Sequence, residues 1–73
     1  MITKLELLND LIRQGCLRLG SLTMSQDVDE NGVKIWEVKK IKLENYIETE
    51  TIFFFTSYSM VEAFGEFLKI SNV

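Results

Sequence analysis

The sequence predicts a single α+β domain over residues 1–73, in the order helix, three strands, helix. Each end of the chain holds a helix-capping pattern followed by apolar residues at helical spacing. The middle of the chain instead alternates apolar and polar residues with the period of two that is typical of strands. We therefore expect a three-stranded antiparallel sheet with two helices packed on one face.

Composition and charge restrict the class of protein. Hydrophobic residues make up 47% and charged residues 26% of the 73 positions, which is typical of a globular chain, and there is no proline to mark a linker. Eleven acidic against eight basic residues give a net charge of −3. This balance argues against free nucleic acid as a ligand, since phosphate binding needs a clustered positive surface, and it suits a basic protein partner.

The chain has one cysteine, Cys16, and no histidine. An internal disulfide is therefore excluded, and so is a Cys–His catalytic pair within the chain. No apolar run approaches the roughly 20 residues of a membrane span. We expect a cytoplasmic protein that is not an enzyme, binds no cofactor or metal, and contacts no membrane.

The first helix is predicted over residues 3–14. Thr3 and Glu6 form a capping box, in which each side chain bonds the backbone amide of the other, and Gly15 is placed to end the helix in the left-handed conformation. The expected buried face consists of Leu5, Leu8, Leu11 and Ile12.

From Cys16 onward the pattern is that of strands. Leu17 and Leu19 lie on one side and Leu22 and Met24 on the other, so that a β-bulge at Gly20-Ser21 would restore the alternation. The pair Asn31-Gly32 is the strongest short hairpin signal, and with it as the turn Val28 falls opposite Ile35.

The next strand is predicted over Val33 to Leu43, with an irregularity near Lys39-Lys40 and a turn at Glu44-Asn45. The last strand, Glu48 to Tyr58, contains three successive phenylalanines and is apolar on both faces. The turn at Glu44-Asn45 would pair Trp36 with Phe53, Ile35 with Phe54, and Lys39 with Glu50, which are favourable cross-strand pairs.

The second helix starts at a capping box formed by Ser59 and Glu62. Gly65 lies in its middle, where glycine costs about 1 kcal/mol relative to alanine, and close packing on a strand is the expected reason for it. The apolar positions at helical spacing are Met60, Val61, Phe64, Phe67 and Leu68.

Three polar patterns each allow two interpretations. The loop Asp27-x-Asp29-x-Asn31-Gly32 copies the first half of a calcium-binding EF-hand loop, but the position of the bidentate glutamate is Val38, which favours a hairpin. Glu48 and Glu50, two apart on one strand face, could act as acid and base, although an exposed ion-pair ladder with neighbouring lysines is favoured. The basic residues of the second strand (Lys34, Lys39, Lys40 and Lys42) could contact phosphates beside Trp36, but their split between two faces favours solvation.

Two groups of residues are candidates for binding a protein partner. Carboxylates near the two turns could imitate phosphates and occupy a basic groove: Asp27, Asp29, Glu30, Glu48 and Glu50. Trp36, Phe53 and Phe55 would share one sheet face, which is an exposed interface if the helices cover the other. This face could also close a homodimer. In the opposite arrangement the helices cover the aromatic face, and Ile35, Ile52 and Phe54 lie outside.

The helix–three strands–helix order resembles the double-stranded-RNA-binding domain. That family reads RNA with a lysine-rich start to its last helix, and here the corresponding positions are Ser59, Met60, Val61, Glu62 and Ala63, so RNA binding is not expected.

A second resemblance concerns architecture and charge over the whole chain. Small, acidic, proline-free and cysteine-poor chains with an N-terminal helix and a three-stranded sheet are similar to phage-encoded anti-CRISPR and related anti-defence inhibitors. The resemblance lies in architecture and charge and includes no diagnostic motif, since the helical segments 8–13 and 61–64 are generic. The resemblance implies a protein that binds and inhibits or regulates a bacterial protein, such as a CRISPR effector, by occupying its basic nucleic-acid-binding surface in the bacterial cytoplasm.

Overall fold

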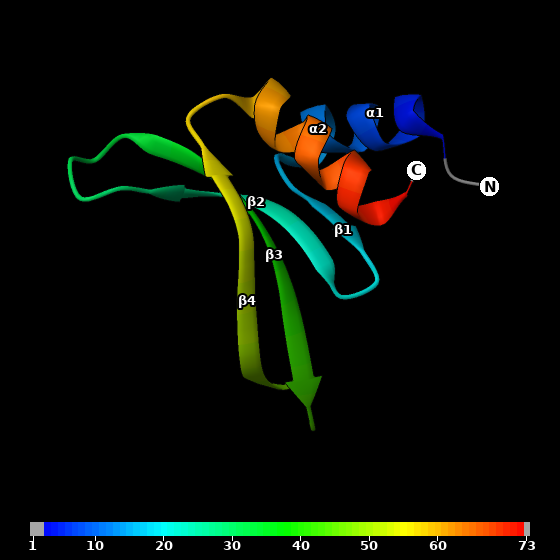
Figure 1. Ribbon diagram of the computed structural model, residues 1–73, viewed down its shortest axis with the longest axis vertical. Helices are drawn as coiled ribbons and strands as arrows, with labels where there is room; N and C mark the ends of the chain where they lie inside the picture. Colours follow the sequence, from blue (N-terminus) through cyan, green and yellow to red (C-terminus); the bar gives the residue numbers. More distant parts are fainter. Residues whose placement is uncertain (1–2, 73) are drawn as a thin grey trace.

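The computed structural model describes residues 3–72, so that Met1, Ile2 and Val73 lie outside it. The elements are, in order, α1 (Lys4–Gln14), β1 (Leu17–Leu19), β2 (Leu22–Val28), β3 (Lys34–Glu44), β4 (Ile47–Ser57) and α2 (Met60–Ser71). The strands form one antiparallel sheet in the order β1-β2-β3-β4, with both helices on one side of it (Figure 1). The α+β class is confirmed, but the predicted number of three strands is wrong.

The additional strand arises at Gly20-Ser21, where a hairpin turn replaces the predicted bulge. Gly20 has a φ of 64°, which suits the first position of a two-residue turn. The turn places Leu19 opposite Leu22 and Leu17 opposite Met24, so that all four side chains share a face. The change of phase in the sequence therefore marks a reversal of the chain.

Helix α1 has the predicted ends. The Thr3 hydroxyl accepts a hydrogen bond from the Glu6 amide at 3.2 Å, and Gly15 ends the helix at a φ of 76°. Its buried face differs from the prediction: Leu7 and Leu11 are buried, whereas Leu5 and Ile12 are 66% and 68% exposed. The reason is that α1 contacts the sheet mainly at the edge strand β1, so that only a narrow arc of the helix meets the core.

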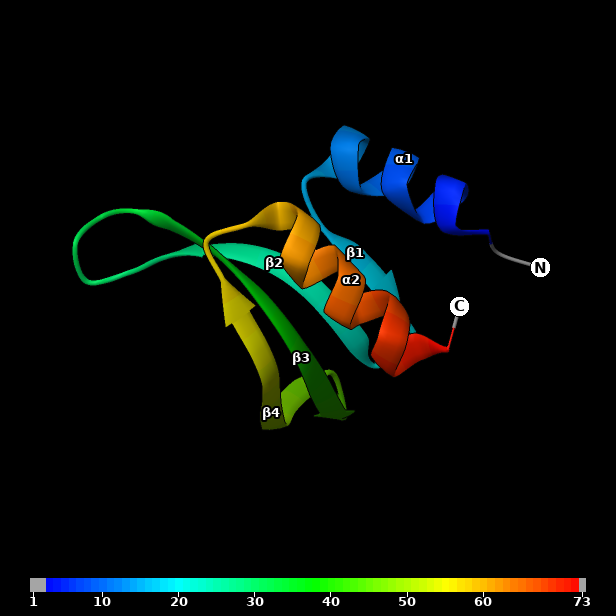
Figure 2. The same cartoon turned by 45° about the horizontal axis from the view of Figure 1, so that its top comes forward.

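Helix α2 lies across β2, β3 and β4 (Figure 2). The Ser59 hydroxyl accepts from the Glu62 amide at 3.3 Å, which is one half of the predicted capping box. The other half does not form, because the Ser59 amide donates to the Ser57 hydroxyl oxygen at 3.0 Å and the Glu62 carboxylate accepts from the Ser57 hydroxyl at 2.6 Å. Ala63 and Phe67 are fully buried against the sheet, with Phe64 and Leu68 partly buried beside them. Val61, predicted on the apolar face, is instead 73% exposed.

The predicted close packing of Gly65 is wrong. Gly65 is exposed, and a Cβ atom built on it would meet no heavy atom of residues 3–72 within 4 Å, the backbone of its own helix and its chain neighbours aside. Its backbone is helical, so alanine fits there without strain. The glycine therefore costs stability without a packing reason.

We expect Gly65→Ala to stabilise the protein by about 0.5–1 kcal/mol, because alanine loses less backbone entropy in a helix. For a domain of this size that is a rise in Tm of roughly 4 °C, measurable by circular dichroism. The control is Gly20→Ala, whose positive φ should lower the Tm. An unchanged or lower Tm in Gly65→Ala would contradict this account.

The β2–β3 turn lies one residue away from the predicted register. The Gly32 amide donates to the Asp29 carbonyl at 3.0 Å, Gly32 has a φ of 81°, and the Asp29 amide donates to the Val33 carbonyl. This is a three-residue loop with a bulge at the glycine, rather than a two-residue Asn31-Gly32 turn. Consequently Asp27, and not Val28, lies opposite Ile35.

The β3–β4 pairing departs further from the prediction. The turn is centred on Asn45 and Tyr46, whose φ angles are 53° and 66°, instead of Glu44 and Asn45. Two register shifts follow along the hairpin, because Phe54 and Thr49 are each an extra residue on β4. Trp36 therefore pairs with Ser57 instead of Phe53. Lys39 pairs with Phe53 instead of Glu50.

These shifts decide which aromatic residues join the core. Trp36 and Phe55 lie on the face that the helices cover, packed against the core, whereas Phe53 lies beside Lys39 on the uncovered face. The predicted single face of Trp36, Phe53 and Phe55 is therefore wrong. The core consists of Leu7, Leu11, Leu17, Leu22, Met24, Val38, Ala63 and Phe67.

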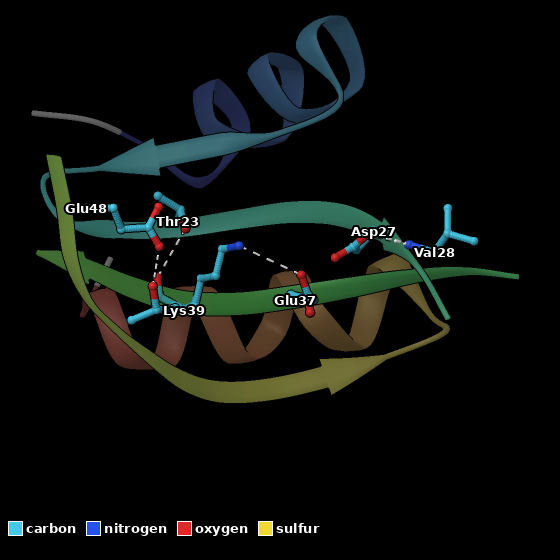
Figure 3. A network of polar contacts seen from close by, with 7 residues as sticks. Thr23, Asp27, Val28, Glu37, Lys39 and Glu48 are labelled. Carbon is cyan, nitrogen blue, oxygen red and sulfur yellow. Dashed lines mark hydrogen bonds and ion pairs between the residues drawn. The ribbon is translucent and has the colours of Figure 1, made fainter. Parts of the chain in front are cut away.

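The uncovered face carries a network of polar contacts, which Figure 3 shows with α2 behind the sheet. The Thr23 hydroxyl donates to the Lys39 carbonyl at 3.2 Å, and the Lys39 ammonium lies 3.8 Å from Glu37 and 5.7 Å from the Phe53 ring centroid. Ile35 lies on this face, as the alternative arrangement predicts, but Ile52 lies on the other. Among residues 3–72, no helix has the length and apolar character needed to cross a membrane.

Candidate interaction surface

The distal part of the β3–β4 hairpin, residues 40–54, projects beyond both helices, and we call it the arm (Figure 1). The helices reach only its base, where Ile70 of α2 lies beside Lys40 and Phe54, so that the rest of the arm is open to solvent on both faces. It carries a dense group of large apolar side chains that are exposed: Leu43, Tyr46, Ile47, Ile52, Phe53 and Phe54. Such a concentration of exposed apolar side chains on a small protein usually marks a binding surface.

Tyr46 stands at the tip of the arm and is 100% exposed. Its φ of 66° is in the left-handed region, which costs a residue with a side chain roughly 1–2 kcal/mol. The pairing Glu44 with Ile47 leaves Asn45 and Tyr46 as the two turn residues, a position where glycine is the favoured second residue. A large aromatic side chain is thus held in water at a position that disfavours it.

Two adjoining hollows lie at the base of the arm. The first, of about 250 Å³, is lined by Ser21, Lys40, Ile41, Lys42, Glu50 and Ile52. The second, of about 230 Å³, shares Ser21 and Lys40 with the first and continues past Phe54 to Ile70 at the end of α2. Together they make a shallow groove on the side of the sheet that carries the helices, with apolar walls, two ammonium groups and one carboxylate.

Two of the three acidic residues predicted to bind a partner at the β2–β3 hairpin already accept hydrogen bonds from groups of this chain. The Asp29 carboxylate accepts hydrogen bonds from the Asn31 and Val33 amides, both at 2.9 Å, and from the Tyr58 hydroxyl at 2.6 Å. Asp27 accepts from the Val28 amide at 2.8 Å. Glu30 is exposed at the loop tip. The Asp29 carboxylate therefore stabilises the turn by accepting hydrogen bonds from its backbone amides.

This arrangement also bears on the calcium-like pattern. Within the described residues, no group of three or more His, Cys, Asp or Glu side chains is placed to hold a metal ion. The Asp29 carboxylate bonds groups of its own chain, and the two strands that flank the loop are not the helices of an EF-hand.

The contact between Asp29 and Tyr58 connects the β2–β3 turn to the start of α2. The Tyr58 hydroxyl, followed by the Val33 and Asn31 amides, holds the pKa of Asp29 below its ordinary value of 3.8. The hydrogen bond to Asp29 and the negative charge of that carboxylate raise the pKa of Tyr58 above 10.0. The contribution of Asp29 to stability is therefore present above pH 3.8 and lost as the pH falls through its lowered pKa. That of Tyr58 is present below pH 10.0 and lost as the pH rises through its raised pKa.

A pH titration of phenolate absorbance tests this contact. The chain has two tyrosines, so Tyr46→Phe leaves Tyr58 as the single reporter. In that background we expect a midpoint above pH 10.0, which Asp29→Asn should lower because it removes the neighbouring negative charge. Equal midpoints with and without Asp29→Asn would show that the two side chains are not in contact in solution.

The two carboxylates predicted to share a strand face lie on opposite faces. Glu50 is opposite Lys42 and lines the groove, whereas Glu48 is opposite Leu43 on the other face, because the extra residue Thr49 separates them. Glu48 accepts a hydrogen bond from the Thr51 hydroxyl (Figure 3). The Lys42 ammonium lies 3.8 Å from Glu44 instead of pairing with Glu50. The acid–base pair, which was the less favoured interpretation of these two residues, thus has no common face on which to form.

The structure therefore divides the candidate residues into three places. Asp27, Asp29 and Glu30 lie at the β2–β3 hairpin, Glu48, Glu50 and Phe53 lie on the arm, and Trp36 and Phe55 lie in or beside the core. Tyr46 and Ile47 at the arm tip were not among the residues predicted from the sequence. The signal that could have identified them is the pair Asn45-Tyr46, which lies between two alternating runs. Placing the turn on this pair instead of on Glu44-Asn45 puts Tyr46 and Ile47 at the tip.

The fold and the surface define a class: an α+β protein with a four-stranded antiparallel sheet, helices on one side of it, and a projecting hairpin arm. Comparison of the chain with protein-family models, with curated proteins and with solved structures finds no match.

Proposed function

We propose that this chain is a protein-interaction module that binds and inhibits or regulates a bacterial protein, with the arm as its contact surface. The observation that carries the proposal is Tyr46, an aromatic side chain that is fully exposed at the tip of an apolar arm in a backbone conformation that disfavours it. Strained residues persist at functional sites because the function compensates their cost.

The chemistry of the arm fits a polypeptide partner. Tyrosine is among the residues most enriched at the energetic centres of protein interfaces, since it offers a large apolar ring with a hydrogen-bonding end. Ile47 beside it is 67% exposed and adds apolar area. The groove at the base of the arm offers apolar walls and charged groups for side chains of the bound chain.

The proposed setting is that of a phage anti-CRISPR or anti-defence inhibitor. The support is the small size, the net charge of −3 and the carboxylates Glu44, Glu48 and Glu50 on the arm, which complement a basic nucleic-acid-binding surface. In this proposal the arm approaches such a surface, the acids steer the encounter, and Tyr46 makes the central contact.

Photo-crosslinking tests the proposal. A photoreactive phenylalanine derivative in place of Tyr46 should give a specific crosslink to one protein in bacterial lysate, whereas the same group in place of Val61 on α2 should not. Both positions are exposed, at 100% and 73%, so that the two variants differ in place rather than in accessibility. Absence of a crosslink at position 46, or the same products from both positions, would refute the arm as the binding surface.

A homodimer is the alternative function that the same experiment separates. The aromatic sheet face that was predicted to close the dimer loses two of its three residues, because Trp36 and Phe55 pack against the core. A dimer would instead have to use the arm or the free edge of β4. A crosslink from position 46 to a second copy of this chain, with no other product, would favour the homodimer over the inhibitor.

A further inference from the structure

The outer edge of β4 is the longest open sheet edge among the described residues. The strand order places β4 at one end of the sheet, paired only with β3, and it is eleven residues long, whereas the opposite edge strand β1 has three. An edge strand presents unpaired backbone amides and carbonyls that can bind another strand. Proteins commonly block such edges with lysine or proline, and β4 contains neither.

The charge around this edge has a single sign. Residues 43–68 contain no lysine or arginine, and they contain five acids: Glu44, Glu48, Glu50, Glu62 and Glu66. The lysines of the sheet lie on β3, which is enclosed between β2 and β4. A strand that pairs with β4 therefore meets carboxylates and no competing cation on the edge strand itself.

The two faces of β4 share one order of residue types. On the groove face Glu50 is followed by Ile52, and on the other face Glu48 is followed by Thr51 and then by Phe53. Ile52 and Phe53 are 44% and 56% exposed, so both can contact a neighbouring strand. On each face the acid lies nearer the arm tip, and the apolar residue lies nearer the part of the sheet that the helices cover, which we call the body.

We infer that β4 binds an extended segment of the partner as a fifth strand, and that this segment is basic on one half and apolar on the other. An antiparallel strand, the arrangement of every pair in this sheet and the more stable one per residue, runs from the body toward the arm tip. The partner segment then carries two adjacent apolar residues followed, after a short polar spacer, by two adjacent basic residues. Cross-strand pairs of opposite charge form with Glu48 and Glu50.

A second copy of this chain fits the edge less well. Its own β4 would bring Glu48 and Glu50 but no cation, its lysine-bearing strand β3 is enclosed, and its other edge, β1, has only three residues. The inference rests on the proposed function, since it specifies the kind of segment that the partner supplies.

The test uses the full chain and a synthetic peptide of two β-branched residues, a threonine spacer and two lysines, flanked by threonines. Isotope labelling and amide hydrogen exchange by NMR should show protection of β4 amides on binding, with an affinity that falls as salt is raised. The double variant Glu48→Lys/Glu50→Lys should weaken binding on the order of tenfold. The matched control Asp27→Lys/Glu30→Lys changes the net charge equally at the other hairpin and should bind as the parent does.

Three results would overturn the inference: no protection of β4 by the basic peptide, equal protection by a peptide with glutamates in place of the lysines, or protection of β4 in a dimer without peptide. The crosslink at position 46 separates this inference from the proposed function. If that crosslink forms but the peptide does not protect β4, the chain binds a protein by another surface of the arm. If the peptide binds but the crosslink is absent, the edge pairs with strands while the proposed function fails.

Discussion

Phe67→Ala is expected to remove most of the stability of the fold. Phe67 is the largest fully buried side chain, and it lies on α2 where that helix packs on the sheet. Truncating a buried phenylalanine costs about 3–5 kcal/mol, because the lost burial is compounded by the cavity that remains. At 0.05–0.15 kcal/mol per residue, a chain of this length has roughly 4–11 kcal/mol in total.

Urea unfolding followed by circular dichroism measures this effect. The parent should unfold in one cooperative transition, while Phe67→Ala should show a strongly lowered midpoint or no transition at all. The matched control is Phe53→Ala, the same chemical change on the uncovered face, where the ring is 56% exposed and contacts the Lys39 ammonium. We expect that variant to lose about 1 kcal/mol or less. Equal losses at both positions would mean that α2 does not pack on the sheet as described.

Tyr46→Gly is expected to change stability and binding in opposite directions. Glycine adopts a positive φ without the steric cost that tyrosine bears at 66°, and the resulting Asn-Gly pair is the favoured turn of this type. After the greater entropy of glycine in the unfolded chain is subtracted, the gain in stability is about 0.5–1 kcal/mol. If Tyr46 is the central contact, partner binding should weaken by about 2 kcal/mol or more, which is roughly 30-fold.

Asn45→Gly is the matched control for that experiment. It relieves the neighbouring positive φ of 53° and keeps the phenol ring, so it should leave both stability and binding close to those of the parent. Thermal unfolding and titration against the crosslinked partner measure the two effects. Undiminished binding by Tyr46→Gly would show that the ring makes no contact with the partner.

Several elements followed from the sequence because their causes are local. The N-cap bonds of Thr3 and Ser59 span only three residues each, and each starts its helix at the predicted position. The glycine at position 15 ends α1 for an equally local reason, since its positive φ is unfavourable for other residues. Much of the strand content was likewise visible as alternation of apolar and polar residues. The connections were not, since the hairpin at Gly20-Ser21 was predicted as a bulge and the other two turns lie one residue from their predicted positions.

The pairing of β4 could not be predicted in the same way. Three successive phenylalanines satisfy either phase of a strand, so that the sequence does not say which of them faces inward. Bulges at Phe54 and Thr49, together with a turn one residue further along, moved the partner of Trp36 from Phe53 to Ser57. The expected exposed aromatic face was lost through this shift.

The sequence by itself determined the α+β class, both ends of α1 and the start of α2, because capping and alternation depend on neighbours in the chain. A single cysteine likewise excludes an internal disulfide. Only the tertiary structure decided the fourth strand, the buried arc of α1 and the side of the sheet that each aromatic residue occupies. The physical reason is that the helices cover one part of one face. What lies under them becomes core, and the arm, which they reach only at its base, becomes surface.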